Sequence, residues 1–246
     1  MVGIHAMRGG TELVPQDATG AETLERLVAA RNYNRWLTDR LQRWVGRRVL
    51  EIGAGLGSMS EFILDRERVV LSDTDPYYLA RLRERFAARP NVRIAELRLP
   101  GVDGSIAAER LDTVICLNVL EHVPNDLASL VAMRTLLQAG GRLVLLVPSL
   151  PSIYGTLDEA LGHVRRYTPA ELRRKSQDAG FRLLHLEYFN LAGVPGWWLT
   201  GRVLRRRVIP TGSLGVFDAL VPLFRLERFF PWRVGQSLIA IGERAP

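Results

Sequence analysis

The 246-residue chain has one cysteine, four histidines, one lysine and no long apolar run. The single cysteine, Cys116, excludes a disulfide framework and a multi-cysteine zinc site. Because histidines are also few, we expect no dedicated metal site. The lack of cysteine pairs indicates a reducing compartment. No stretch approaches the roughly 18 apolar residues of a membrane-spanning helix. The N-terminus lacks the apolar core of a secretory signal, so the sequence predicts a cytoplasmic protein.

Acidic residues are scarce only in the C-terminal part of the chain. The net charge is +7, and residues 151–246 hold 14 basic and 8 acidic side chains. Nearly all the basic residues are arginine, with Lys175 the one lysine. A solvated basic surface explains this excess more simply than a nucleic-acid site does, and we expect no nucleic-acid partner.

Short apolar runs alternate with helical patterns along most of the chain. Strands are predicted over Arg48–Ile52, Arg68–Ser72, Val92–Glu96, Leu111–Leu117, Arg142–Val147, Phe181–Phe189 and Ser237–Gly242, and helices over Ser58–Asp65, Pro76–Ala88, Asp126–Leu137 and Pro169–Ala179. Strands separated by helices indicate right-handed crossovers and a mostly parallel sheet covered on both faces. Residues 1–20 are predicted to be a flexible tail, and Glu22–Val45 one or two amphipathic helices. Residues 21–246 are predicted to form a single domain.

Three motifs lie where ligands bind in such sheets, at the carboxyl ends of the strands. The first, Val49 to Gly57, is an apolar strand that ends in Glu51 and enters the loop Gly53-Ala54-Gly55-Leu56-Gly57, whose glycines permit sharp bends and close ligand approach. The helix expected after this loop would offer free N–H groups to a ligand. The second motif is Asp73, about 20 positions after the loop, where a carboxylate accepts ribose hydroxyls. The third motif is the stretch Asn118-Val119-Leu120-Glu121-His122 after the fourth predicted strand.

Together these motifs resemble class I S-adenosylmethionine (SAM)-dependent methyltransferases over roughly residues 30–190. The resemblance implies a Rossmann-like, doubly wound sheet of seven strands, mostly parallel with the last strand antiparallel, and SAM as cofactor. The cofactor contacts that it implies are Tyr33, Glu51, Gly53, Ala54, Gly55, Gly57, Asp73, Thr74, Leu97, Asn118, Val119 and His122. Tyr33 is a candidate lid over the methionine end of SAM, although core packing explains it more simply. Arg98 stands where the family has an acid facing adenine, which leaves backbone groups near Leu97 as candidates for that contact.

Residues 150–168 are predicted to be the substrate loop. Their Tyr154-Gly155 … Asp158 … Gly162-His163-Val164-Arg165-Arg166-Tyr167-Thr168 pattern resembles a bacterial branch often found near glycosyltransferases. The resemblance suggests a sugar-like, lipid-linked or natural-product acceptor. The candidate substrate contacts are Tyr154, His163, Arg165, Arg166, Tyr167 and Trp197. An alternative for the arginines is that one pairs with Asp158 or Glu159 and only orders the loop.

A hydroxyl acceptor benefits from a base that titrates near neutral pH, as histidine does. His163 is the candidate base, with Asp158 as its orienting partner; alternatively, His163 only fixes the turn after Gly162. His122 is a weaker candidate base, because shaping the floor of the cofactor site explains it better.

Residues 190–234 form an aromatic, basic insertion before the last strand. Leu214, Phe217, Leu220, Val221 and Phe224 recur at helical spacing, with arginines on both sides. Three interpretations remain open: a cover on the acceptor pocket, a dimer contact, or a surface that rests on anionic lipid.

The sequence therefore predicts a SAM-dependent methyltransferase, monomeric or homodimeric, with oxygen the favoured target over nitrogen or carbon. A nicotinamide oxidoreductase is a weaker alternative, because its fingerprint requires glycine rather than serine at position 58. A non-catalytic SAM-binding partner of a glycosyltransferase is the other alternative.

Overall fold

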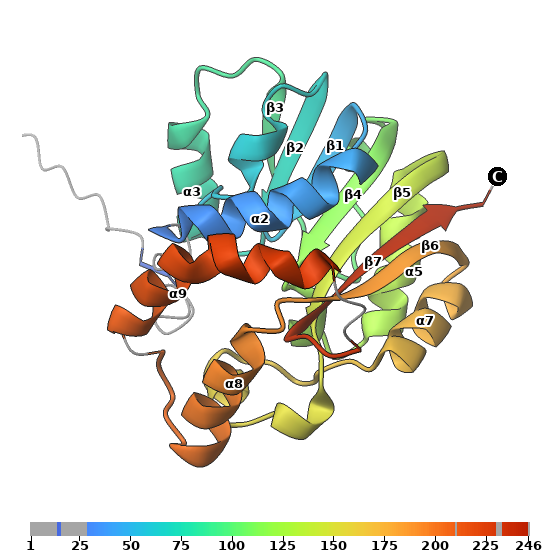
Figure 1. The fold of residues 1–246 in the computed structure, drawn as a ribbon. Helices are drawn as coiled ribbons and strands as arrows, with labels where there is room; N and C mark the ends of the chain where they lie inside the picture. The colour runs from blue at the N-terminus through green and yellow to red at the C-terminus, as the bar shows by residue number, and fades with distance from the viewer. Residues whose placement is uncertain (1–13, 16–28, 210, 230–232, 246) are drawn as a thin grey trace, which may run out of the picture.

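A seven-stranded sheet forms the centre of the computed structural model, which describes residues 14–15, 29–209, 211–229 and 233–245 (Figure 1). The strands are β1 Arg48–Ile52, β2 Arg68–Asp73, β3 Val92–Glu96, β4 Leu111–Leu117, β5 Leu137–Pro148, β6 Phe181–Phe189 and β7 Ser237–Arg244. Their order is β3-β2-β1-β4-β5-β7-β6. All pairs from β3 to β5 are parallel, and β7 is antiparallel to both β5 and β6. The predicted fold class is confirmed.

Helices cover both faces of this sheet. They are α2 Arg31–Leu41, α3 Pro76–Arg85, α4 Gly104–Ala107, α5 Asp126–Leu136, α6 Thr156–Ala160, α7 Pro169–Asp178, α8 Gly193–Trp197 and α9 Thr211–Phe224. Short 3-10 helices are η1 Gln42–Trp44, η2 Ser60–Ile63, η3 Leu120–His122, η4 Pro151–Ile153 and η6 Arg225–Phe229, and a π-helix, η5, spans Trp198–Val203. None of the described helices is long and apolar enough to cross a bilayer.

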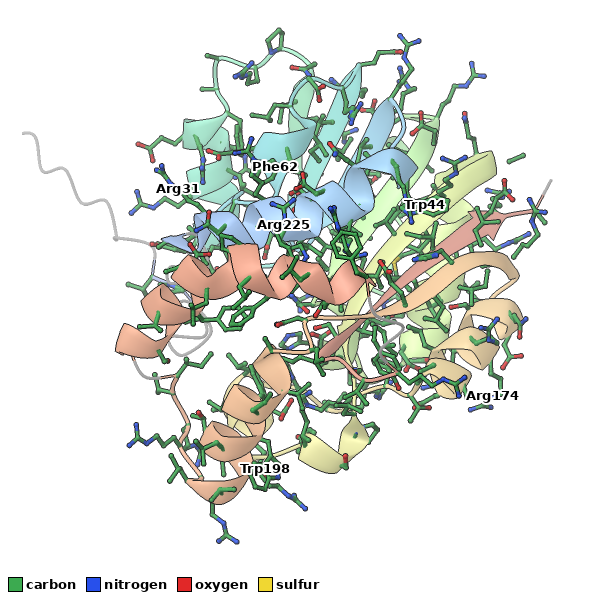
Figure 2. All side chains as sticks on the ribbon, in the orientation of Figure 1. Arg31, Trp44, Phe62, Arg174, Trp198 and Arg225 are labelled. Atoms are coloured by element: carbon green, nitrogen blue, oxygen red, sulfur yellow. The ribbon has the colours of Figure 1, made fainter. Side chains whose placement is uncertain are left out.

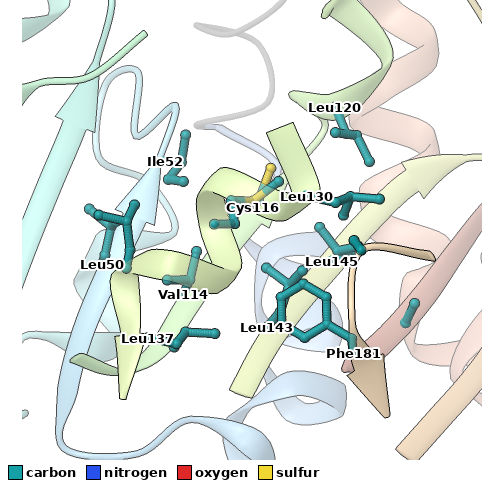
Figure 3. Packing of buried hydrophobic residues seen from close by; sticks show 14 of the residues in the cluster. Leu50, Ile52, Val114, Cys116, Leu120, Leu130, Leu137, Leu143, Leu145 and Phe181 are labelled. Atoms are coloured by element: carbon teal, nitrogen blue, oxygen red, sulfur yellow. The ribbon is translucent and has the colours of Figure 1, made fainter. Parts of the chain in front are cut away.

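Two apolar clusters, one on each face of the sheet, hold the layers together. Along β1, Val49 belongs to one cluster and Leu50 to the other, as the alternation of side chains along a strand requires. One cluster joins the sheet to α5 and α7 through residues such as Leu130 and Leu172 (Figure 3 shows part of it). The other joins it to α2, α3 and α9, with Trp36 almost fully buried.

The helix predicted over Ser58–Asp65 is wrong. Only the 3-10 turn Ser60–Ile63 forms there, and no side chain caps its start. The hydroxyl of Ser60 donates to Oε2 of buried Glu51 at 2.6 Å, which ties this segment to the end of β1. The α-helix expected after the glycine loop is therefore reduced to this single 3-10 turn.

The insertion between β6 and β7 is helical, as predicted. It consists of α8, η5, α9 and η6, and α9 lies along α2 (Figure 1). Asp218 of α9 accepts a hydrogen bond from the backbone N–H of Tyr33 at 2.8 Å. The predicted tail, residues 1–20, lies outside the described residues except for 14 and 15.

Candidate functional site

The strand order places the three sequence motifs together. Connections from β1 and β4 lead to opposite sides of the sheet, so the carboxyl ends of these neighbours form the switch point where ligands of such sheets bind. Ile52 pairs with Cys116 at this edge. Gly53 and Asn118 follow these strand ends, and both are exposed.

The glycine loop has the backbone that its sequence predicts. Gly53, Gly55 and Gly57 have φ values of 72°, 54° and 77°, a region that residues with a Cβ rarely adopt. A Cβ at Gly53 would lie 2.4 Å from Cγ2 of Val119, so Val119 fits directly against the loop. The N–H groups of Gly53 and Ala54 both donate to the carbonyl of Ser72 at 2.9 Å.

The Asp73 carboxylate is held at the rim of this loop. One oxygen accepts the N–H of Gly55 at 2.9 Å, and the other accepts those of Thr74 and Asp75 at 2.7 and 3.0 Å. These bonds orient the carboxylate beside the loop, where a ribose acceptor is predicted. Asp75 caps α3 by accepting the N–H of Tyr77, as expected from its sequence position.

Two of the predicted cofactor residues lie beneath the edge rather than on it. Glu51 is buried, and this burial raises the pKa of its carboxyl to about 7 despite the hydrogen bond from Ser60. Leu97 is also buried, and its N–H already donates to the carbonyl of Asp73 at 3.2 Å. The side chain and the N–H of Leu97 are therefore both engaged within the fold, and the adenine contact by backbone groups near Leu97 stays a prediction.

The substrate loop is built around a buried carboxylate, Asp158. Its Oδ1 lies 2.9 Å from Nδ1 of His163 and accepts Nε of Arg166 at 2.7 Å. Its Oδ2 accepts the indole N–H of Trp197 and the N–H of Gly155 at 3.1 and 3.0 Å. Burial opposes ionisation, but the hydrogen bond from His163 and the Arg166 charge hold the pKa of Asp158 below its ordinary value. The predicted pairing of Asp158 with His163 is present.

The other side of the His163 ring faces residues that follow β4. Nε2 of His163 lies 3.8 Å from Oε1 of Glu121, and the ring is nearly perpendicular to that of His122, with centroids 4.9 Å apart. Glu121 is fully buried, neither carboxylate oxygen has a hydrogen-bond partner among the described residues, and burial raises the pKa to about 8. Ligand atoms of Glu121, His122 and His163 lie within 4.8 Å of one another, close enough to hold a metal ion.

Two predicted substrate residues serve a different part of the molecule. Arg165 contacts Oδ2 of Asp126 at 2.6 Å, and the hydroxyl of fully buried Tyr167 donates to the same oxygen at 2.9 Å. These contacts tie the loop to α5, and a substrate contact by Arg165 or Tyr167 stays a prediction. Arg166 is buried and donates hydrogen bonds to Oδ1 of Asp158 and to the carbonyl of Ser149. These contacts favour the alternative interpretation, in which this arginine orders the loop.

A cavity of about 220 Å³ lies beside the Asp158 cluster. Its wall is mostly apolar and comes from α2, α8, α9 and the loops around them, including Tyr33, Leu157, Trp197, Thr200, Ile209, Leu214 and Phe217. The Trp197 ring is parallel to that of His163, with centroids 6.5 Å apart, so Trp197 links the cavity to the histidine. The hydroxyl of Tyr154 donates to the carbonyl of His163 at 2.7 Å and holds the loop in place.

Comparison with known proteins agrees with this geometry. A family model described as a methyltransferase domain matches residues 50–143. The ubiquinone biosynthesis O-methyltransferase of Aeromonas salmonicida is 30% identical over 166 residues, which are 59% of this chain and 67% of that protein. The chain belongs to the class I SAM-dependent methyltransferases. It spans about half the length of other curated relatives that it matches.

Solved methyltransferase structures share the fold. In a complex of the Haloferax volcanii Trm112 methyltransferase activator, the chain assigned as a methyltransferase superposes with a TM-score of 0.64 at 15% identity, covering 96% of this chain and 100% of that one. The trans-methyltransferase CalH, crystallised with SAH, superposes with a TM-score of 0.53 at 22% identity, covering 81% and 52%.

SAM is the cofactor of this family, and the residues at the switch point fit it. The left-handed loop that only glycines form without strain, the oriented Asp73 carboxylate and the exposed edge at Asn118 offer a cradle and a hydroxyl acceptor. Sequence reasoning missed the place of Glu121 against His163. Leu214 and Phe217, for which a cover on the acceptor pocket is one of the three open interpretations, line the cavity. An acidic residue inside an apolar run was the available signal for Glu121.

Proposed function

We propose that this methyltransferase transfers the methyl group of SAM to a hydroxyl oxygen of a small molecule, of the sugar-like, lipid-linked or natural-product class. The observation that carries the proposal is the Asp158–His163 pair. A carboxylate on Nδ1 holds the proton on that nitrogen and leaves Nε2 as the proton acceptor. An oxygen acceptor is the target that gains most from such a base, because its hydroxyl must lose a proton.

Two further observations support oxygen and the acceptor class. The Aeromonas relative is named as an O-methyltransferase. The substrate loop resembles a branch often found near glycosyltransferases, and the adjoining cavity combines an apolar wall with the polar groups of Asn190, Thr200 and Gln236. A hydroxylated molecule with an apolar part matches this lining.

The chemistry divides between cofactor and protein. When bound, SAM supplies a methyl carbon whose bond to the sulfonium sulfur breaks as the bond to the acceptor oxygen forms. The hydroxyl proton passes to Nε2 of His163, and Asp158 stabilises the resulting imidazolium through Nδ1. Asp158 stays in place because Arg166, Trp197 and Gly155 also donate to it. The protein otherwise acts by aligning the acceptor with the methyl group and excluding water.

The test compares His163→Ala with His185→Ala, a control histidine on β6 whose ring lies near Trp44. SAM affinity is measured by calorimetry, and SAH formation is followed with panels of phenols, sugars and amines. We expect both variants to bind SAM normally and only His163→Ala to lose turnover, by about 10²–10⁴. Methylation of amines alone would overturn oxygen as the target. SAM binding without SAH formation on any acceptor would instead indicate a non-catalytic partner protein.

A further inference from the structure

Large apolar side chains are exposed together on one short segment of the insertion. This segment, residues 198–208, comprises η5 and the turn after it, and we call it the arginine-rich tip. Its exposed apolar residues are Trp198, Leu199, Val203, Leu204 and Val208, which are 39 to 51% exposed. Figure 1 shows α8 and the chain after it at the lower edge of the molecule, away from the sheet, and Figure 2 places Trp198 there. Large apolar side chains that are exposed together in this way are a feature of interaction sites.

The charge of the tip is of one sign. It contains four arginines, Arg202, Arg205, Arg206 and Arg207, and no acidic residue. Arg205, Arg206 and Arg207 are exposed and form no ion pair with any residue in the described part of the chain. A second copy of the chain is a poor binding partner for the tip, because a symmetric contact through the tip would bring these like charges together.

Hydrogen bonds attach the tip to the substrate loop. The hydroxyl of Thr156 lies 3.0 Å from the carbonyl of Gly201 and 2.6 Å from that of Arg206. Arg202 donates to the carbonyl of Tyr154 at 3.0 Å. The exposed apolar side chains therefore sit on an anchored element rather than on a free loop.

We propose that the arginine-rich tip docks on an anionic lipid bilayer and that the acceptor is carried in that bilayer. Tryptophan and aliphatic side chains enter the interface, and arginines pair with anionic headgroups. The second part of this inference rests on the proposed methyl transfer; the docking itself does not.

The position of the cavity connects docking to catalysis. Trp197 and Thr200 line the cavity, whereas their neighbours Trp198 and Leu199 are exposed on the tip. One helical turn thus faces the acceptor cavity on one side and solvent on the other. An acceptor with an apolar tail passes from the bilayer into the apolar cavity without crossing water.

The experiment is co-sedimentation of the full chain with vesicles of phosphatidylcholine alone, or of equal parts phosphatidylcholine and phosphatidylglycerol. One variant carries Trp198→Ser and Leu204→Ser, and another carries Arg205→Gln, Arg206→Gln and Arg207→Gln. The matched controls are Val131→Ser on α5 and Arg173→Gln with Arg174→Gln on α7, all exposed positions.

We expect binding to the anionic vesicles only, weakened by salt, and a loss of about a hundredfold in the triple arginine variant. Loss of binding in the serine variant, with the controls like wild type, supports docking through the tip. Equal binding to both vesicle types, or equal binding by tip and control variants, overturns it. A serine variant that dissociates a dimer, seen by sedimentation in lipid-free buffer, also overturns it.

Calorimetric SAM binding and SAH formation with water-soluble acceptors separate this inference from the proposed function. Tip variants that retain both but lose vesicle binding support docking as a distinct property. Vesicle binding by a chain that methylates no hydroxyl leaves the docking in place and overturns the proposed function instead.

Discussion

Nδ1 of His163 lies 2.9 Å from Oδ1 of Asp158, and both side chains, which belong to the substrate loop, are buried. A carboxylate in this position fixes which imidazole nitrogen carries the proton. The same carboxylate accepts from Arg166 and Trp197, so one buried group orders both the candidate base and the wall of the acceptor cavity.

Replacing Asp158 by asparagine tests this relationship while keeping the shape of the side chain. The amide donates to Nδ1 as readily as it accepts, so the wrong tautomer of His163 becomes accessible and turnover falls by about 10²–10⁴. The rate recovers in part at high pH, where the acceptor hydroxyl ionises unaided. Calorimetry should find SAM affinity unchanged. A variant whose rate falls only in proportion to the unfolded fraction, measured by circular dichroism, would make Asp158 purely structural.

Asp73→Asn tests the ribose contact. It removes the charge of an acceptor that also holds the N–H groups of Gly55 and Thr74, so we expect SAM binding at least tenfold weaker, from about 1.5–3 kcal/mol of charge-assisted hydrogen bonding. Asp103→Asn is the control, because Asp103 caps α4 through the N–H of Ser105 in the same manner. Equal SAM affinity in both variants contradicts the assignment, and tighter binding of NAD than of SAM would favour an oxidoreductase.

Gly53→Ala probes the fit of the cofactor loop. Alanine at this position must adopt the left-handed backbone of Gly53, which costs roughly 1–2 kcal/mol. Its Cβ would also lie 2.4 Å from Cγ2 of Val119. We expect weaker SAM binding and a lower melting temperature, and partial recovery of both when Val119→Ala is added. Gly104→Ala is the control, because a Cβ added at Gly104 has no other atom within 4 Å. This variant should change neither SAM binding nor the melting temperature. Failure of the double variant to recover would mean that backbone strain alone decides the effect.

The sequence predicts the elements that are decided by neighbouring residues, and it fails where a contact between residues distant in the sequence decides the structure. The strands β1, β3, β4 and β6 match their predicted bounds, because apolar runs between turns are local signals. The failed helix after the glycine loop reflects a tertiary bond, between Ser60 and Glu51, that overrides local propensity.

In the candidate site, contacts between residues close in sequence are predictable, and contacts that depend on the sheet topology are not. Asp158 and His163 are close in sequence, and their pairing is predictable. Glu121 reaches His163 only through the sheet topology, and Arg165 and Tyr167 turn to Asp126 on α5 for the same reason. One loop sequence does not say toward which neighbour each of its side chains points.

Added Zn²⁺ is expected to inhibit methyl transfer. Two imidazoles and a carboxylate form a typical zinc ligand set, and the ligand atoms of Glu121, His122 and His163 already lie within 4.8 Å. A bound ion would occupy Nε2 of His163, the nitrogen proposed to take the acceptor proton. Steady-state rates should fall with zinc and return with EDTA, and His122→Ala should be less sensitive relative to its own metal-free rate. Stimulation by zinc would assign the three side chains to an activating metal instead.

Glu121→Gln is expected to stabilise the protein above about pH 4.5, and increasingly so up to about pH 8. Burial raises the pKa of Glu121 to about 8 in the folded chain, and no described hydrogen bond compensates its charge. Below the ordinary carboxyl pKa of about 4.5, folded and unfolded chains both hold the proton. As the pH rises toward 8, the unfolded chain releases the proton and the folded chain keeps it, so stability is lost by at most about 1.4 kcal/mol per pH unit. Glutamine has the same shape and does not titrate.

Thermal unfolding of both proteins across this pH window measures the effect. The melting temperatures should agree at about pH 4, and the variant should be the more stable by several degrees at about pH 8.5. Glu96→Gln, at an exposed position at the end of β3, is the matched control and should follow wild type throughout. Glu51 titrates in the same direction, with its pKa raised to about 7, so the variant keeps part of the wild-type slope. A variant less stable than wild type at the higher pH would mean that Glu121 is ionised and paired with the nearby Arg166, whose Nη2 has no other partner among the described residues.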